Sequence, residues 1–184
     1  SGDYTFYDKF SLTCHFKNNK LFRGHKGINI GSPRRTFIMT GNDISDYNYK
    51  FNNVLGEICN INSPMNAFIN ISNNPNTSNS HLGYSISNGT ATNILFKNNT
   101  LTNLKTGFYT HDLIARSIKS ENNNITISSS EPVNSDAAIS YYNSNGGDAC
   151  DNDIYLKGSG GQFLTGISNV FSGFGVLNEN HIYD

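Results

Sequence analysis

Hydrophobic and polar residues alternate along most of this chain in short runs. Runs such as 28–30 (INI), 125–127 (ITI) and 154–156 (IYL) place every second side chain on the same face, which is the period of a β-strand. Asn, Gly and Ser separate the runs, and no amphipathic stretch of ten or more residues carries helix caps. The pattern therefore predicts an all-β protein made of many short strands.

Two columns of residues recur along the chain every 23–30 positions. The first is an apolar column, Leu21, Ile44, Ile71, Leu101, Ile125, Ile154 and Ile182, and two positions before each member stand Asn19, Asn42, Ile69, Asn99, Asn123, Asn152 and Asn180. The second column is Gly27, Gly56, Gly83, Gly107, Ala137 and Gly166. Segments 16–27 (FKNNKLFRGHKG) and 96–107 (FKNNTLTNLKTG) show the same repeat directly.

A repeat of this length is typical of a parallel β-helix, because a coil of three short strands and three turns takes about 20–30 residues. Coils lie about 4.8 Å apart, so equivalent residues stack. Asn tolerates left-handed backbone, so we expect the Asn column to fill the same turn in each coil and to form a hydrogen-bonded ladder. We predict a single-stranded parallel β-helix of about seven coils over residues 10–184. Residues 1–9 are assigned to a tag remnant and a lead-in segment, and the whole to a piece of a longer protein.

The composition narrows the classes of partner. The chain has 30 Asn and 21 Ser, only 15% charged residues and a net charge of −1, so it has no basic stripe for nucleic acid. No apolar run approaches the roughly 18 residues that a membrane span requires, and we expect no membrane insertion. The three cysteines form no CxxC pair, so neither a zinc site nor a disulfide framework is expected. No cofactor is expected.

The Asn column and the Ile/Leu column beside it resemble those of right-handed, pectate-lyase-like β-helices. The Asn-, Ser- and Gly-rich, Trp-free and weakly charged sequence resembles bacteriophage tailspikes and tail fibres. This resemblance implies a homotrimer, on a virion tail or otherwise extracellular, that binds and often cleaves bacterial surface polysaccharide such as capsule or O-antigen. Three functions stay open: receptor binding, polysaccharide degradation by a lyase or glycoside hydrolase, and a structural shaft or adhesin segment.

One surface combines aromatic and polar side chains of the kind that bind sugars. If Phe108 points inwards, Tyr109 and His111 point outwards, and Tyr142 of the next coil falls beside them. Asp112 and Arg116 follow on the same coil as Tyr109. These five residues, Tyr109, His111, Asp112, Arg116 and Tyr142, are the candidate carbohydrate-binding surface. The alternative is that they are ordinary exposed residues.

The acidic residues suggest neither a catalytic pair nor a firm metal site. Asp148, Asp151 and Asp153 are weak candidates for Ca²⁺, but their spacing is not that of an EF-hand, and a solvated polar loop is the favoured interpretation. Glycosidases need two carboxylates about 5–10 Å apart. In the turn that holds the Asn column, Asp151 and Glu179 form the one acid pair on adjacent coils, and we assign no catalytic residue.

Overall fold

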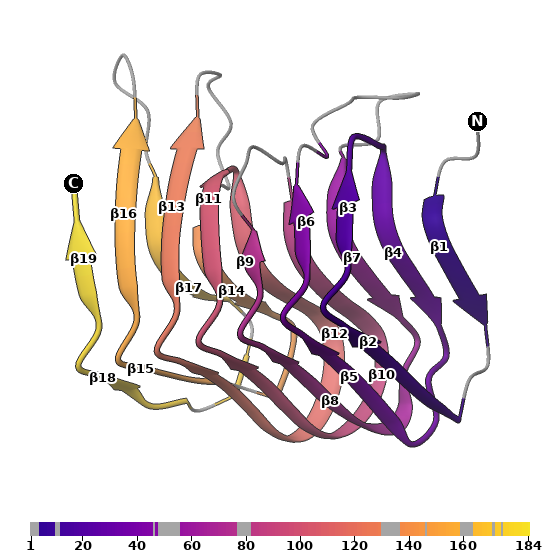
Figure 1. The fold of residues 1–184 in the computed structure, drawn as a ribbon. Helices are drawn as coiled ribbons and strands as arrows, with labels where there is room; N and C mark the ends of the chain where they lie inside the picture. The colour runs from indigo at the N-terminus through magenta and orange to yellow at the C-terminus, as the bar shows by residue number, and fades with distance from the viewer. Residues whose placement is uncertain are drawn as a thin grey trace.

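The chain folds into one stack of parallel coils (Figure 1). The structure is a computed structural model. It describes residues 4–9, 12–45, 47, 56–76, 82–129, 137–145, 147–158, 164–170, 172–173 and 175–184. Every strand pair within these residues is parallel, and no helix occurs among them. The predicted parallel β-helix is therefore confirmed.

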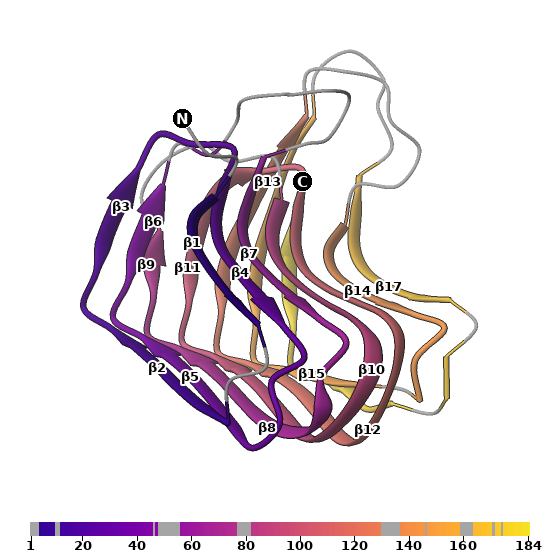
Figure 2. The same ribbon diagram turned by 90° about the vertical axis from the view of Figure 1, so that its right-hand side faces the viewer.

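Each coil contributes to three faces, which Figure 2 shows nearly end-on. The first face holds β1 (Tyr4–Lys9), β4 (Lys26–Gly31), β7 (Glu57–Asn62), β14 (Ala137–Tyr142), β17 (Thr165–Val170) and the first halves of β10 (Leu82–Lys97) and β12 (Thr106–Glu121). The second face holds β2 (Thr13–Lys17), β5 (Thr36–Thr40), β8 (Met65–Ser72), β15 (Asp148–Cys150), β18 (Leu177–Asn178) and the second halves of β10 and β12. The third face holds β3 (Lys20–Phe22), β6 (Asp43–Ser45), β9 (Pro75–Asn76), β11 (Thr100–Leu104), β13 (Asn124–Ser129), β16 (Asp153–Gly158) and β19 (His181–Tyr183).

The first face fixes the number of turns. Its strands pair in the order β1-β4-β7-β10-β12-β14-β17, so the chain completes six turns between the first strand and the last. The seven coils predicted over residues 10–184 correspond to the seven strands of the third face. β1, which lies in the predicted lead-in segment 1–9, pairs with β4 and so contributes a strand to the stack.

The interior is filled by the apolar residue of each alternating pair. Ile28, Tyr84, Phe108 and Ile139 stack along the inside of the first face and are almost completely buried. Phe96, from the second face, lies flat against Phe108 with ring centroids 4.6 Å apart and an interplanar angle of 5°. Burying one such side chain contributes about 1.5–3 kcal/mol, and this repeats at each level of the stack.

A ladder of asparagines runs along the corner between the second and third faces. In each coil the backbone N–H and the side-chain amide of the ladder Asn donate to the side-chain oxygen of the Asn in the next coil, at 2.8–3.2 Å. The second amide hydrogen goes to a backbone carbonyl, for example from Asn99 to Ile71 at 3.0 Å. The members are Asn19, Asn42, Asn74, Asn99, Asn123, Asn152 and Asn180.

In this turn the residue with left-handed backbone is the one that precedes the ladder Asn. The sequence had predicted that conformation for the ladder Asn itself. Positive φ angles of 52–66° occur at Asn18, Gly41, Asn73, Asn98, Asn122, Asp151 and Glu179. The ladder Asn needs its side chain turned inwards to bond along the stack. The preceding residue makes the bend and exposes its own side chain.

Two expected column members are wrong. The third ladder residue is Asn74, and Ile69 lies inside β8, because a longer connection separates the second and third coils. In the apolar column Asn76 replaces Ile71, and its amide donates to the Tyr84 hydroxyl at 2.8 Å.

Two predicted members of the glycine column are also wrong. Strand pairing aligns Gly27, Ile58, Gly83, Gly107, Ala138 and Gly166, so Gly56 and Ala137 are not members. Both errors come from counting across connections of unequal length.

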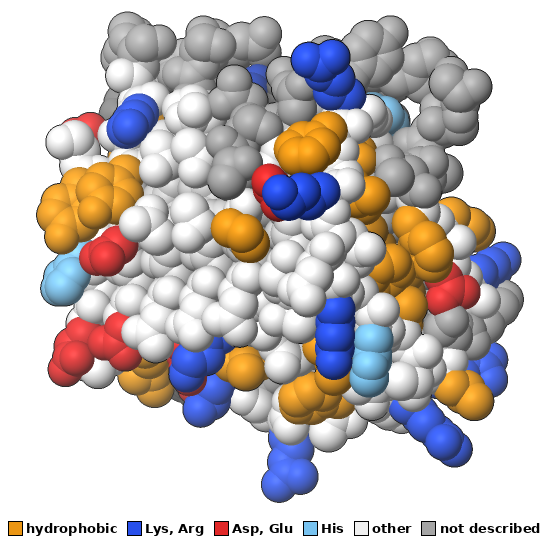
Figure 3. Space-filling view, in the orientation of Figure 1, with side chains coloured by type: hydrophobic (Ala, Val, Ile, Leu, Met, Phe, Trp, Pro, Cys, Tyr) orange, Lys and Arg blue, Asp and Glu red, His pale blue; other side chains and the backbone are white. Residues whose placement is uncertain are grey.

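The visible surface of the third face is weakly charged. Figure 3 shows mostly uncharged polar side chains and backbone across its middle, with charged groups scattered around the rim. Among the described residues, no helix is long and apolar enough to span a membrane.

Candidate functional site

The outer side of the first face carries the predicted aromatic row. Phe108 and Thr110 are fully buried, so strand alternation turns Tyr109 and His111 of β12 outwards. Parallel pairing then sets Ser140 beside Tyr109 and Tyr142 beside His111. These strands lie along the right-hand side of Figure 2.

Three rings form a continuous cluster at this point. The imidazole of His111 lies parallel to the ring of Tyr142, with centroids 5.0 Å apart and an interplanar angle of 11°. Tyr109 tilts towards His111, at 5.7 Å and 33°. Tyr142 keeps 36% of its surface exposed, so one aromatic side chain remains accessible to a ligand.

A carboxylate holds the histidine in place. Asp112 Oδ2 lies 2.9 Å from His111 Nδ1, and the Asn143 amide donates to Asp112 Oδ1. Asp112 and Asn143 have φ angles of 49° and 44°, and both occupy the corner between the first and second faces. Left-handed backbone outside glycine is uncommon, and the side-chain hydrogen bond between consecutive coils supports it here. The carboxylate therefore orients the imidazole against Tyr142.

A hollow of about 490 Å³ adjoins the rings. Its lining mixes methyl groups, hydroxyl groups and two aromatic rings, and it is formed by Leu82, Thr106, Tyr109, Ala137, Ser140, Tyr142, Thr165, Ser168 and Val170. None of these residues carries a charge at neutral pH. The lining thus offers apolar contacts and hydroxyl groups that donate or accept hydrogen bonds.

The electrostatics of the cluster keep Tyr109 protonated. Partial burial raises the pKa of Tyr109, and the nearby Tyr142 and Asp112 raise it further. The phenol is therefore a hydrogen-bond donor at neutral pH and not a base.

The structure brings together four of the five predicted residues. Arg116 lies beyond the Asp112 bend, in a separate hollow of about 120 Å³ with Asn145 and Asp148. Sequence reasoning did not include Asn143 and Ser168. Asn143 follows Tyr142 directly, and Ser168 lies one coil beyond Ser140, so the repeat could have identified both.

The three aspartates proposed as a weak calcium site serve different contacts. Asp148 Oδ1 accepts from the Val176 backbone N–H at 2.9 Å. Asp153 lies 3.1 Å from His181, and Asp151 occupies the left-handed turn position. In the described part of the chain, no group of three His, Cys, Asp or Glu side chains is arranged to hold a metal ion.

Comparison with models of protein families, with curated proteins and with solved structures finds no match to this chain.

Proposed function

We propose that this chain is a polysaccharide-recognition domain and that the hollow beside His111 and Tyr142 binds a segment of bacterial surface glycan. The observation that carries the proposal is the parallel His111–Tyr142 ring pair next to an uncharged hollow of about 490 Å³. Sugar rings present C–H faces to aromatic rings and hydroxyl groups to side-chain donors and acceptors, and the lining offers both.

The uncharged lining favours a neutral sugar over a uronate. Tyr109 donates a hydrogen bond, Ser140 and Ser168 each donate or accept one, and Leu82 and Val170 supply apolar contacts. We therefore infer a capsule or O-antigen repeat with methyl-bearing groups, such as deoxy or N-acetyl sugars. A tailspike or tail-fibre domain, acting as a homotrimer on a virion tail or otherwise outside the cell, is the setting we propose.

A second candidate function, polysaccharide cleavage, rests on the His111–Asp112 pair. A carboxylate 2.9 Å from one imidazole nitrogen orients the ring and favours its acting as an acid or base through the other nitrogen. Pure binding is favoured because no carboxylate lines the hollow, whereas a glycosidase acts through two.

The test is binding to a panel of purified capsular and O-antigen polysaccharides, followed by calorimetry. We expect Tyr142→Ala to weaken binding about tenfold, equivalent to about 1.4 kcal/mol. Tyr155→Ala is the matched control, because Tyr155 is also a stacked tyrosine but lies on the third face. If no polysaccharide binds, or if both variants weaken binding equally, the proposal is wrong.

Cleavage is measured on the same panel as release of reducing ends. His111→Gln should abolish release if the second function holds and leave it unchanged from background if the domain only binds.

A further inference from the structure

Strand pairing is interrupted at one corner of the stack, between the first face and the second. β10 and β12 cross this corner as single 16-residue strands and pair in one register through Gly89 and Leu113. On the other side of β12, pairing with β14 ends at His111 and pairing with β15 begins at Lys119. The interruption breaks the regularity of the coils, so it is a local feature of this part of the chain.

The interruption leaves a hollow of about 120 Å³ on the second face, with a polar lining formed by Arg116, Ser117, Asn145 and Asp148. We call it the second-face hollow. The side chain of Asn145 takes the place of a strand partner here, because its oxygen accepts from the Ala115 backbone N–H at 2.7 Å and its amide donates to the Ala115 carbonyl. The Tyr141 hydroxyl donates to the Asp148 carbonyl at 3.0 Å. These bonds fix the backbone around the hollow.

Two opposite charges line the second-face hollow without forming an ion pair. Arg116 is exposed and, within the described part of the chain, makes no hydrogen bond or ion pair. Asp148 Oδ1 accepts from the Val176 backbone N–H at 2.9 Å, which holds the carboxylate in place. The guanidinium only donates hydrogen bonds, the carboxylate only accepts them, and the hydroxyl of Ser117 does both.

This set of groups fits an uncharged sugar that is rich in hydroxyl groups. Neighbouring sugar hydroxyls accept from a guanidinium and donate to a carboxylate at the same time. An acidic sugar would bring its own carboxylate close to Asp148, and an amino sugar would bring its charge close to Arg116, and both contacts are repulsive. The lining thus differs from that of the hollow beside His111 and Tyr142, which carries no charged group and offers apolar contacts.

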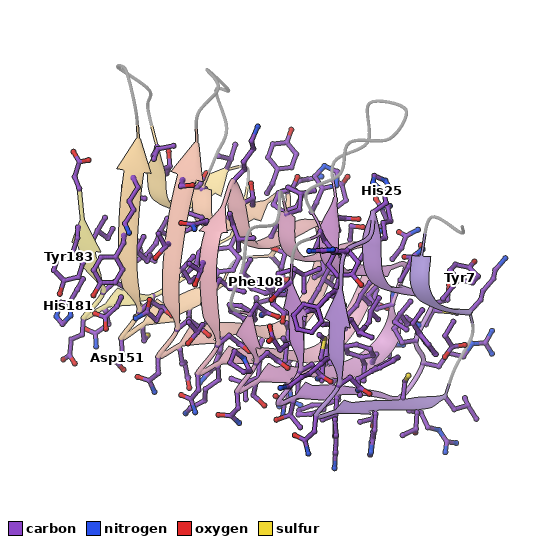
Figure 4. All side chains as sticks on the ribbon, turned by 45° about the horizontal axis from the view of Figure 1, so that its top comes forward. Tyr7, His25, Phe108, Asp151, His181 and Tyr183 are labelled. Atoms are coloured by element: carbon purple, nitrogen blue, oxygen red, sulfur yellow. The ribbon has the colours of Figure 1, made fainter. Side chains whose placement is uncertain are left out.

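The two hollows lie on either side of one corner. Tyr142 lines the first and Asn145 lines the second, and three residues of chain span at most about 11 Å. At the corner between them the Asn143 amide donates to the Asp112 carboxylate. The second face then continues to its far corner at Asp151, which Figure 4 shows pointing away from the stack. A short oligosaccharide is long enough to reach from one hollow to the other.

We propose that the second-face hollow is a second sugar subsite, which binds an uncharged, hydroxyl-rich sugar of the same glycan whose methyl-bearing sugar occupies the hollow beside His111 and Tyr142. The inference rests on the function proposed above and adds the path of the bound glycan, which crosses the corner at Asp112 from the first face to the second. Because the two sugars are linked, the longer glycan binds more tightly than either sugar alone.

The test is calorimetry with fragments of the panel polysaccharide that binds best, prepared by partial acid hydrolysis and separated by length. We expect Arg116→Ala to weaken binding of fragments of two repeating units about tenfold, as the loss of a hydrogen bond to a charged group does. It should leave the affinity of the methyl-bearing sugar alone unchanged. Tyr142→Ala should weaken binding of both.

The matched control is Lys17→Ala, which removes a positive charge from an exposed residue at the other end of the second face. Circular dichroism should show equal melting temperatures for this variant, for Arg116→Ala and for the unmodified chain. If Tyr142→Ala weakens binding and Arg116→Ala acts no more strongly than Lys17→Ala, the second subsite is wrong and the first hollow keeps its function. An equal effect of Arg116→Ala on the single sugar would also overturn the second subsite. If no glycan binds, both proposals are wrong.

The class of sugar is tested with an acidic panel polysaccharide and its carboxyl-reduced form. We expect the reduced form to bind the unmodified chain more tightly. Asp148→Asn keeps an oxygen for the Val176 N–H and removes the negative charge, so it should narrow the difference between the two forms. A difference that Asp148→Asn leaves unchanged would overturn the assignment of the second-face hollow to an uncharged sugar.

Discussion

The asparagine ladder makes a sharp prediction about stability, and Asn99 is the best place to test it. Asn99 is 1% exposed, and its side chain makes four hydrogen bonds. Its oxygen accepts from the Asn74 backbone and amide at 3.1 and 2.8 Å, and its amide donates to Asn123 and to the Ile71 carbonyl, both at 3.0 Å. Asn99→Ala removes all four.

The cost follows from the groups left behind. The Asn74 N–H, one Asn74 amide hydrogen and the Ile71 carbonyl lose their partners in a buried place, while Asn123 keeps a bond from the Asn99 backbone. An unsatisfied buried group costs about 1–3 kcal/mol, so with three such groups we expect Asn99→Ala to reduce the free energy of unfolding by about 3–9 kcal/mol. This is a large share of the roughly 5–15 kcal/mol that stabilises a typical domain.

Two variants serve as comparisons in the same urea titrations, followed by circular dichroism. Asn19→Ala removes only a half-buried donor at the first coil, and we expect a loss of about 0.5–1.5 kcal/mol. Asn98→Gly changes the adjacent, exposed residue, whose φ of 53° glycine adopts freely, and should be nearly neutral. If Asn99→Ala costs no more than Asn19→Ala, the ladder is not the source of stability that the geometry indicates.

Three further changes test the interior. Leu101→Asp buries an unpaired carboxylate at a fully buried position, and we expect no cooperative unfolding transition in circular dichroism. Gly83→Ala would set a methyl group in steric conflict with the Gly107 carbonyl oxygen of the next coil, so the melting temperature should fall, by an amount equivalent to about 1–3 kcal/mol. Tyr84→Phe leaves the Asn76 amide without its hydroxyl acceptor and should cost about 1–3 kcal/mol in urea unfolding. Burial raises the pKa of Cys14 from 9.0 to about 11, so the alkylation rate of Cys14 should reach half its maximum near pH 11 in the folded chain and near pH 9 in urea.

The sequence predicts the fold because the repeat returns the same residue to the same place. The turn is written Asn18-Asn19, Asn73-Asn74 and Asn98-Asn99, so identity alone does not separate the bend from the ladder. The variants of the pair do separate them: Gly41-Asn42 and Asp151-Asn152 keep Asn only at the second position. The first residue needs left-handed backbone, which Gly, Asn and Asp adopt, whereas the second needs an amide.

The errors in register have a common physical origin. The step from Asn42 to Asn74 is 32 residues and the next step is 25, because connections between strands vary while the coils do not. The sequence also did not predict Asn76 as a member of the apolar column, since that column predicts an apolar residue at each position. The Asn76 amide is stable there because it donates to the Tyr84 hydroxyl at 2.8 Å and its oxygen accepts from the Ile44 backbone N–H at 3.0 Å.

The candidate site was predictable as far as strand alternation extends. Tyr109, His111 and Tyr142 follow from it, because alternation and a single register decide which side chains are neighbours. The Asp112–Asn143 contact lies in a corner where alternation ends, and Arg116 was misplaced for the same reason. A residue five positions beyond a strand residue has crossed the bend and faces another surface.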